Sequence, residues 1–307
     1  MTIDYDKLMK WRIPEVLQRY TTRDTILYAL GVGLGSDPLD ERQLRFVYEK
    51  NLLVLPTYLL VLAHPGFWLK DPGTGVDCVK LVAAGQQLRI HRLPLPEGEV
   101  VGRTHVSGIV DKGPGKGALV SYTREVRDAS SGDLLSTLIS TSLCRADGGF
   151  GGPSGPVPAV HTMPERSPDH TCDLPTLPQA ALIYRLNGDY NPLHADPAVG
   201  RAAGFDRPIL HGLCSMGVAS HALLKTVCDY DPACIAELDV RFSAPVLPGE
   251  TLRTEIWRDD DVVSFRTKVL ERGVVVLNNG RAILLHLPRT RVSSTLRCSS
   301  DTADGEA

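Results

Sequence analysis

The sequence predicts an α+β fold built from two similar halves. Nearly continuous apolar stretches of helical length occupy residues 53–66 and 208–227. Each is followed by runs that are rich in β-branched residues and divided by turn residues, at 76–145 and 236–287, as expected of strands. A chain of 307 residues is long enough for two domains of about 150 residues each. The same order of helix and strands therefore occurs twice.

The first half opens with helical segments. Residues 4–20 carry apolar side chains loosely at helical spacing, which indicates a short amphipathic lead-in. A second helix follows, with Thr22 or Asp24 as its N-cap and an end near Gly31. Residues 53–66 are hydrophobic on every side, so we expect a buried helix there.

Two short segments of the strand region are typical of hairpin turns. They are GPGKG at 113–117 and DASSGD at 128–133. GPGKG also has the glycines of a phosphate-binding loop. It lacks the full spacing of that loop and a following helix, so we interpret it as a turn.

Composition divides the chain into four parts. We expect an N-terminal repeat at 1–147 and a C-terminal repeat at 178–290. Residues 148–177 between them are dense in glycine and proline and have no apolar periodicity, which predicts a linker. Residues 291–307 are small and polar, which predicts a disordered tail.

Composition also argues against several classes of protein. A formal net charge of -3 gives no reason to expect nucleic acid or a membrane as the partner. No stretch approaches the roughly 20 apolar residues that span a bilayer. The seven cysteines are scattered without a C-x-x-C pair, which is typical of reduced thiols. With no apolar leader and a final GEA that is not a peroxisomal address, we expect a cytoplasmic protein.

The stretch 184–217 carries the strongest functional signal. An acid, an amide and an imidazole follow one another closely as Asp189, Asn191 and His194. A glycine and a proline make this segment too irregular for a helix or strand, and two titratable groups on such a loop suit proton transfer. Gly212 lies just beyond, where the apolar helix is expected to begin.

An internal alignment tests the repeat. Residues 26–30 match residues 182–186, which places Gly33 opposite Asp189. The first copy thus lacks the acid that the second copy keeps. We therefore expect one catalytic half and one binding half.

These segments resemble a known family. RLNGDYNPLHAD and AGFDRPILHGLCSMG look like the D-x-N-P-L-H motif and the HGL element of MaoC-like, hydratase 2 enzymes, and RDTILYALGVG and LPTY look like the degenerate N-terminal repeat of the longer members. The resemblance implies a tandem (double) hot-dog fold, with an antiparallel sheet wrapped around a central apolar helix in each repeat. It also implies a hydro-lyase that reversibly hydrates a trans-2-enoyl-CoA to the (3R)-hydroxyacyl-CoA without a separate cofactor, with the acyl chain bound by the N-terminal repeat. Two repeats already form one catalytic unit, so a monomer would be self-sufficient; pairing into a homodimer is common in the family, and the oligomeric state is left open.

By motif position, the resemblance assigns catalysis to Asp189, Asn191, His194 and the backbone of Gly212. Hydration needs a base for the water, an acid for C2 and a donor for the thioester oxygen. We expect Asp189 and His194 to hold one water together, and which of them takes its proton is left open. Asn191 would position the water or the imidazole. An unpaired N–H at the start of a helix suits Gly212 as the oxyanion donor.

Other interpretations of these residues compete. His211, Cys214 and His221 have metal-ligating side chains, but a buried helix favours core packing for the last two and a turn-shaping role for His211, so we expect no metal. The CoA phosphates would need basic residues, and the sequence singles out none of the nearby candidates. These are Arg185, Arg201, Arg207, Lys225 and Arg241.

Three further functions compete with the hydratase. One is a dehydratase of 3-hydroxyacyl thioesters on acyl-carrier protein or with specialised acyl groups such as steroid side chains. The others are a hot-dog thioesterase and a non-catalytic acyl-binding protein. The intact D-x-N-P-L-H motif argues against the last two. Acyl chain length is left open.

Overall fold

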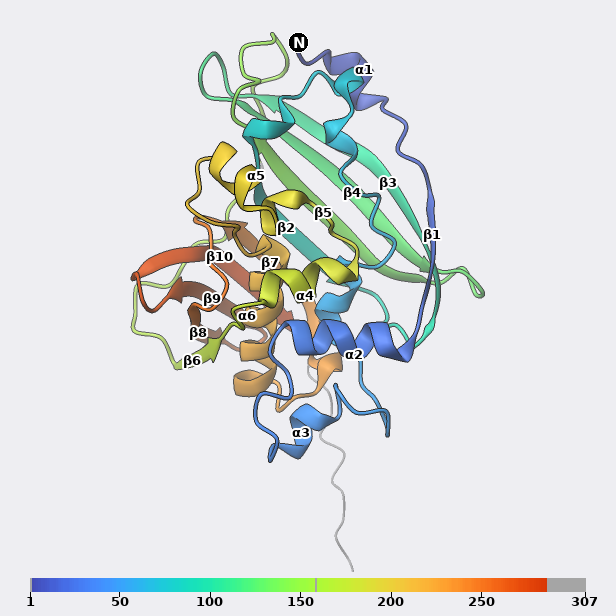
Figure 1. Ribbon diagram of the computed structural model, residues 1–307, viewed down its shortest axis with the longest axis vertical. Helices are drawn as coiled ribbons and strands as arrows, with labels where there is room; N and C mark the ends of the chain where they lie inside the picture. Colours follow the sequence, from blue (N-terminus) through green and yellow to red (C-terminus); the bar gives the residue numbers. More distant parts are fainter. Residues whose placement is uncertain (1, 158, 286–307) are drawn as a thin grey trace, which may run out of the picture.

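The computed structural model describes residues 2–157 and 159–285, which contain a ten-stranded antiparallel sheet with helices packed against it (Figure 1). The elements of the first repeat are α1 (Tyr5–Met9), β1 (Val16–Tyr20), α2 (Thr22–Gly31), α3 (Glu41–Leu44), η1 (Pro56–Leu60), η2 (Trp68–Lys70), η3 (Pro72–Thr74), η4 (Cys78–Lys80), β2 (Leu81–Ile90), β3 (Gly98–Asp111), β4 (Ala118–Asp128) and β5 (Leu134–Cys144). The elements of the second are β6 (His170–Pro175), α4 (Ala180–Tyr184), η5 (Arg185–Asn187), η6 (Pro192–His194), α5 (Pro197–Ala202), α6 (Gly212–Val227), η7 (Pro232–Cys234), β7 (Ile235–Phe242), β8 (Thr251–Asp259), β9 (Val262–Val269) and β10 (Val274–Leu284).

The strand order confirms the internal repeat. It runs β1-β3-β4-β5-β2-β7-β10-β9-β8-β6, so each repeat contributes five strands in the same relative order, counted from its own edge. The two repeats meet where β2 pairs with β7, with Leu88 opposite Leu238. The matched helices α2 and α4 lie side by side (Figure 1), and the aligned Tyr28 and Tyr184 have ring centroids 5.8 Å apart. This is the predicted double hot-dog fold.

Helix α6 is the central helix of the second repeat. Every residue from Cys214 to Leu224 is buried, and the helix packs against β6, β8 and η1. Its core cluster includes side chains of both repeats, so burial of apolar surface holds the repeats together. Within the described residues, no helix has the length and apolar character needed to cross a membrane.

For residues 53–66, the prediction of a helix is wrong, but the prediction of burial is confirmed. Only Pro56–Leu60 is helical, as a short 3-10 turn. Ala63 has a φ of 48°, a left-handed conformation that ends a helix, and Pro65 follows two residues later. The side chains of Leu59, Leu60 and Leu62 are nevertheless fully buried. The first repeat therefore has no long central helix.

Three other expectations need correction. The linker predicted at 148–177 contains β6, an edge strand that pairs with β8. This strand buries only Cys172 and Leu174, and two inward side chains are too few to indicate a strand in the sequence. The lead-in at 4–20 is a short helix followed by strand β1. The N-cap of α2 is Thr21, whose backbone N–H donates to the Asp24 carboxylate over 2.8 Å. The tail at 291–307 lies outside the described residues.

Both turn predictions are confirmed. GPGKG joins β3 to β4, and the N–H of Lys116 donates to the carbonyl of Gly113 over 3.1 Å. DASSGD joins β4 to β5, where the N–H of Gly132 donates to the carbonyl of Asp128 over 2.9 Å. Neither segment precedes a helix of the kind that a phosphate-binding loop requires.

The close approach of α6 to α2 yields a stability prediction. A Cβ added at Gly217 would lie 2.6 Å from Cγ1 of Val32, so Gly217→Ala should lower the free energy of unfolding by about 1–3 kcal/mol through overpacking. Gly108→Ala is the matched control, because a Cβ there meets nothing within 4 Å. Chemical denaturation of both variants measures the difference. Equal stability of the two variants would contradict the packing that we describe.

Candidate active site

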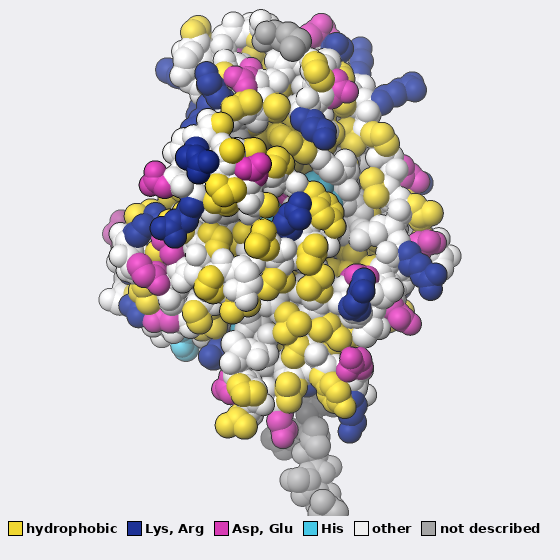
Figure 2. All heavy atoms as spheres, viewed as in Figure 1, with side chains coloured by type: hydrophobic (Ala, Val, Ile, Leu, Met, Phe, Trp, Pro, Cys, Tyr) yellow, Lys and Arg dark blue, Asp and Glu magenta, His cyan; other side chains and the backbone are white. Residues whose placement is uncertain are grey.

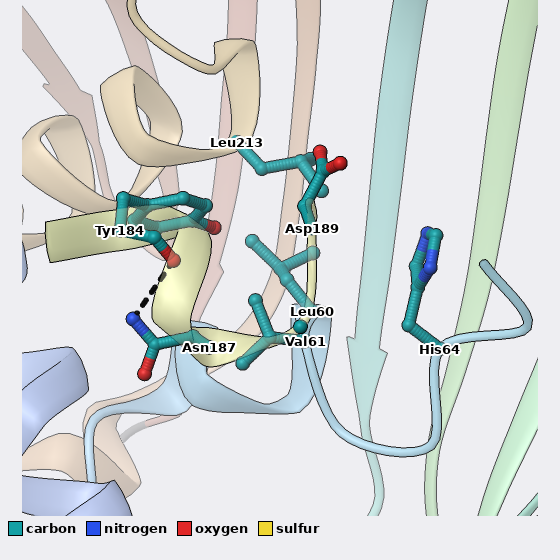
Figure 3. Close-up of a pocket in the computed structure, with 8 residues that line it drawn as sticks. Leu60, Val61, His64, Tyr184, Asn187, Asp189 and Leu213 are labelled. Carbon is teal, nitrogen blue, oxygen red and sulfur yellow. Dashed lines mark hydrogen bonds between the residues drawn. The ribbon is translucent and has the colours of Figure 1, made fainter. Parts of the chain in front are cut away.

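A tight turn after α4 places Asp189. The carbonyl of Arg185 accepts the N–H of Gly188 over 3.1 Å, and Gly188 has a φ of 115°, which an L side chain rarely adopts. Nδ2 of Asn187 donates to the backbone carbonyl of Tyr184 over 3.1 Å (Figure 3), which fixes the turn to the end of the helix. The Asp189 side chain extends from this turn and is 35% exposed.

Asn191 organises the next turn. Its Oδ1 accepts the N–H of Leu193 over 3.1 Å, as the N-cap of η6. Its own N–H donates to Oδ1 of Asp189 over 3.2 Å. The side-chain oxygen of Asn191 is therefore engaged with the backbone. The geometry favours Asn191 as a residue that positions Asp189 and His194.

A backbone contact sets the tautomer of His194. Its Nδ1 lies 2.8 Å from the carbonyl oxygen of Ile209. A carbonyl only accepts hydrogen bonds, so Nδ1 carries the proton and Nε2 keeps a free lone pair. Burial lowers the pKa of His194, although the Ile209 carbonyl and the Asp189 carboxylate oppose this shift. The imidazole is thus neutral near pH 7, with Nε2 ready to accept a proton.

His211 holds the two catalytic segments together. It is 1% exposed and its ring stacks on that of His194 with centroids 3.7 Å apart. Its Nε2 donates to the backbone carbonyl of Asp189 over 3.2 Å. Burial, with the neighbouring His194, lowers the pKa of His211 to about 3, so it is a neutral donor and forms no ion pair with Asp189. It does more than shape the turn before Gly212, which is the role that the sequence suggested.

Asp189, His194 and His211 converge on one point. Each offers one ring nitrogen or carboxylate oxygen, and these atoms all lie within 4.8 Å of one another. Two acceptors at that separation are within reach of a single water molecule, because each hydrogen bond spans about 2.8 Å. The same three side chains could also coordinate a metal ion. His194 Nδ1 and His211 Nε2 already donate to carbonyl groups, which favours a shared water.

Gly212 is the first residue of α6. Its N–H precedes the first intrahelical hydrogen bond, which the N–H of Ser215 donates to the carbonyl of His211 over 3.2 Å. The N–H of Gly212 is therefore one of the unpaired donors at a helix start. A Cβ at Gly212 would lie 2.9 Å from the Phe242 ring. The Phe242 ring thus leaves little room for a side chain at this position.

Two pockets adjoin the catalytic loop. The smaller has a volume of about 10 Å³, space for about one water molecule, and its lining includes Asp189, His64, Leu60 and Leu213 (Figure 3). The larger has a volume of about 200 Å³ and shares Val61, Asn187 and Gly188 with the first. On the same side of the molecule, hydrophobic side chains gather over α2 and α4 (Figure 2).

Several pocket residues were missed from the sequence. His64 and Leu60 come from the apolar segment of the first repeat, where only LAHPG hinted at a polar group. Gly33, the counterpart of Asp189, is not at this pocket: a Cβ there would face His221 Nδ1 at 3.9 Å. His221 and Cys214 are fully buried, as expected of core packing.

The structure also assigns none of the basic candidates to the CoA phosphates. The guanidinium of Arg185 lies over the Tyr190 ring, 4.9 Å from its centroid. That contact places a cation at the rim of the larger pocket, which Tyr190 lines.

Buried histidines predict an acid-sensitive fold. Burial lowers the pKa values of His64, His211 and His221 to about 4, 3 and 4. The unfolded chain, with histidine pKa values near 6.5, binds more protons below about pH 6.5. Stability is therefore complete above that pH and is lost as the pH falls towards the folded-state values. Calorimetry should give a lower Tm at about pH 5 than at about pH 7.5, with a weaker decrease in His221→Gln. An unchanged Tm in the unsubstituted protein would refute the assignment.

Comparison with known proteins agrees with this geometry. Residues 159–280 match the MaoC like domain, and residues 18–146 match the MFE-2 hydratase 2 N-terminal domain. The chain is 39% identical to "Enoyl-CoA hydratase 2, peroxisomal" of Arabidopsis thaliana, over 89% of this chain and 93% of that protein. It is 42% identical to "3-hydroxyacyl-thioester dehydratase Y" of Mycobacterium tuberculosis, over 83% of this chain and 88% of that protein.

A solved structure extends the similarity to the fold. The MaoC-like dehydratase of Phytophthora capsici superposes with a TM-score of 0.81 at 35% identity, covering 92% of this chain and 99% of that one. The two matched domains together span both repeats and include the Asp189 and His194 loop. The chain therefore belongs to the MaoC-like dehydratase and hydratase 2 family and is a hydro-lyase of that family.

Proposed function

We propose that the protein catalyses the reversible, (R)-specific hydration of a trans-2-enoyl-CoA to the (3R)-hydroxyacyl-CoA. The observation that carries this proposal is the convergence of Asp189 and His194 within 4.8 Å, with Nε2 of His194 free to accept a proton. The similarity to an enoyl-CoA hydratase 2 along almost the whole chain supports a CoA thioester as the substrate.

In this proposal, one water donates a hydrogen bond to the Asp189 carboxylate and another to Nε2 of His194. Its oxygen lone pair is then directed away from both groups, towards C3 of the substrate. As the C3–O bond forms, His194 takes the water proton and returns it to C2. The negative charge of Asp189 stabilises the transient imidazolium. The proton and the hydroxyl group both originate on one side of the double bond.

The thioester oxygen gains negative charge when water adds to C3. We assign its stabilisation to the N–H of Gly212, at the start of the 16-residue helix α6. A helix start favours negative charge through its unpaired N–H groups and its dipole. Leu213, the next residue, lines the same small pocket as Asp189, which is consistent with this placement. Gly212→Ala is no clean test, because its Cβ would strike Phe242.

A second candidate for the physiological function is the reverse reaction, dehydration of a 3-hydroxyacyl thioester. The 42% identity to a 3-hydroxyacyl-thioester dehydratase favours it. The same residues serve both directions, because each step of the hydration is reversible. Assays with an enoyl-CoA and with a (3R)-hydroxyacyl-CoA compare the two directions, and carrier-protein thioesters test the alternative carrier.

Two substitutions test the catalytic assignment. His194→Ala removes the base and should lower kcat with crotonyl-CoA by about 10²–10⁴-fold, and Asp189→Asn should cause a loss in the same range. The decrease in enoyl-thioester absorbance measures the rate, and chiral analysis should identify the (3R) product. His105→Ala is the matched control, because His105 is an exposed residue of β3 far along the chain from the site.

Near-normal turnover by a correctly folded His194→Ala or Asp189→Asn variant would contradict the site assignment. Release of free CoA without hydration would contradict the proposed reaction and favour a thioesterase. Circular dichroism and thermal unfolding of each variant separate a catalytic loss from a folding defect.

A further inference from the structure

Arg124 is an arginine on the inner face of the sheet. It lies on β4 between Tyr122 and Val126, whose side chains share its face, and it is only 6% exposed. Its Nη2 donates to the carbonyl of Leu60 over 2.6 Å. Its Nε and Nη1 are buried and have no hydrogen-bond partner among the described residues. Burial lowers the pKa of Arg124 to about 10, which still leaves it charged near pH 7.

His64 is near both this cation and the catalytic loop, because the charges of Arg124 and Asp189 both act on its pKa. It lines the small pocket together with Asp189 and Leu60, and Figure 3 shows it on the opposite side of that pocket from Asp189. Its Nδ1 accepts the N–H of Gly66 over 3.1 Å, so a neutral His64 carries its proton on Nε2. Burial, followed by the nearby Arg124, lowers the pKa of His64 to about 4, and the ring is therefore neutral. It adds a hydrogen-bond donor to the cation.

We propose that Arg124 and His64 form a subsite for a carboxylate carried by the acyl group of the substrate. This inference rests on the proposed hydratase function and adds a substrate class to it: short trans-2-enoyl-CoA thioesters with a carboxyl group at the far end of the acyl chain. Both residues belong to the first repeat: His64 lines the small pocket together with Asp189, and Arg124 donates to the carbonyl of Leu60, another residue that lines it.

Electrostatics selects the carboxylate. A buried cation with two unpartnered nitrogens is costly, and a purely apolar acyl chain would leave it unpaired. A carboxylate matches the planar fork of a guanidinium and provides acceptors for the unpaired N–H groups. A CoA phosphate is more heavily charged and hydrated, so it suits an exposed cation better than one that is 6% exposed. The small pocket holds about one water molecule, and the adjoining pocket of about 200 Å³, which shares Val61, Asn187 and Gly188 with it, has room for a short acyl group.

A pair of substrates tests the subsite. Trans-2-hexenoyl-CoA and trans-2-hexenedioyl-CoA have acyl chains of the same length and differ at the end, in a methyl or a carboxylate group. We expect the protein to prefer the carboxylate substrate. Arg124→Met keeps the length of the side chain and removes the charge. It should lower kcat/KM for the carboxylate substrate by about 10²-fold, mainly through KM, and leave the methyl substrate nearly unchanged. Arg103→Met, which removes an exposed arginine of β3, is the matched control.

Each other outcome has a distinct meaning. A preference for the methyl substrate in the unsubstituted protein overturns the subsite, and so does an equal loss on both substrates in Arg124→Met, which would instead indicate that Arg124 supports the Leu60 segment. Failure to hydrate either substrate refutes the proposed function. In that case calorimetry with the saturated pair, hexanoyl-CoA and adipoyl-CoA, still tests the subsite, because tighter adipoyl-CoA binding must depend on Arg124. If Arg124→Met does not fold, His64→Leu takes its place in both assays.

Discussion

The antiparallel pairing of β2 with β7 is the constraint on which the rest of the structure depends. It joins two five-stranded repeats into a single sheet and sets helices α2 and α4 side by side. As a result, the apolar segment of the first repeat meets the catalytic loop of the second. The pocket beside Asp189 has lining residues from both repeats, among them Leu60 and Leu213. Neither repeat could form this pocket alone.

Duplication has left the two repeats with different roles. The second repeat has a long buried helix whose start provides an unpaired N–H, and the loops of Asp189 and His194 are hydrogen-bonded to residues at that start. The first repeat replaces its own central helix with the short turn η1, which leaves the Leu60 carbonyl free to accept from Arg124. The first repeat thus lacks a central helix, and the non-helical segment in its place brings polar groups towards the active site of the second repeat.

Much of the fold could be predicted from the sequence because its signals are local. The strand patterns, the hairpin turns and helix α6 follow from the spacing of apolar and turn residues within each segment. The 53–66 segment was predicted as a helix because its hydrophobicity reports burial and not conformation. The left-handed Ala63 could not be read from the sequence. Strand β6 was missed because its stability comes from pairing with β8, a distant segment.

In the candidate site, too, the features with local signals could be predicted and those that depend on distant segments could not. Asp189, Asn191 and His194 lie within one motif, and their grouping was visible in the sequence. The tautomer of His194 depends on Ile209, and its stacking on His211 depends on the path of the chain between the two loops. His64 and Arg124 are far from the motif along the chain. Alternation on β4 does place Arg124 on the same face as Val120 and Val126, a signal that could have identified it.

The central claim is that Asp189 and His194 hold one water, which supplies both the hydroxyl group and the proton. Hydration of crotonyl-CoA in D₂O tests this claim most directly, because the product carries deuterium at C2 and the new hydroxyl group at C3. The relative configuration of the two centres is measured from proton coupling constants. The account predicts syn addition, with deuterium and hydroxyl delivered to the same face. Anti addition would require a proton donor on the opposite face and would contradict it.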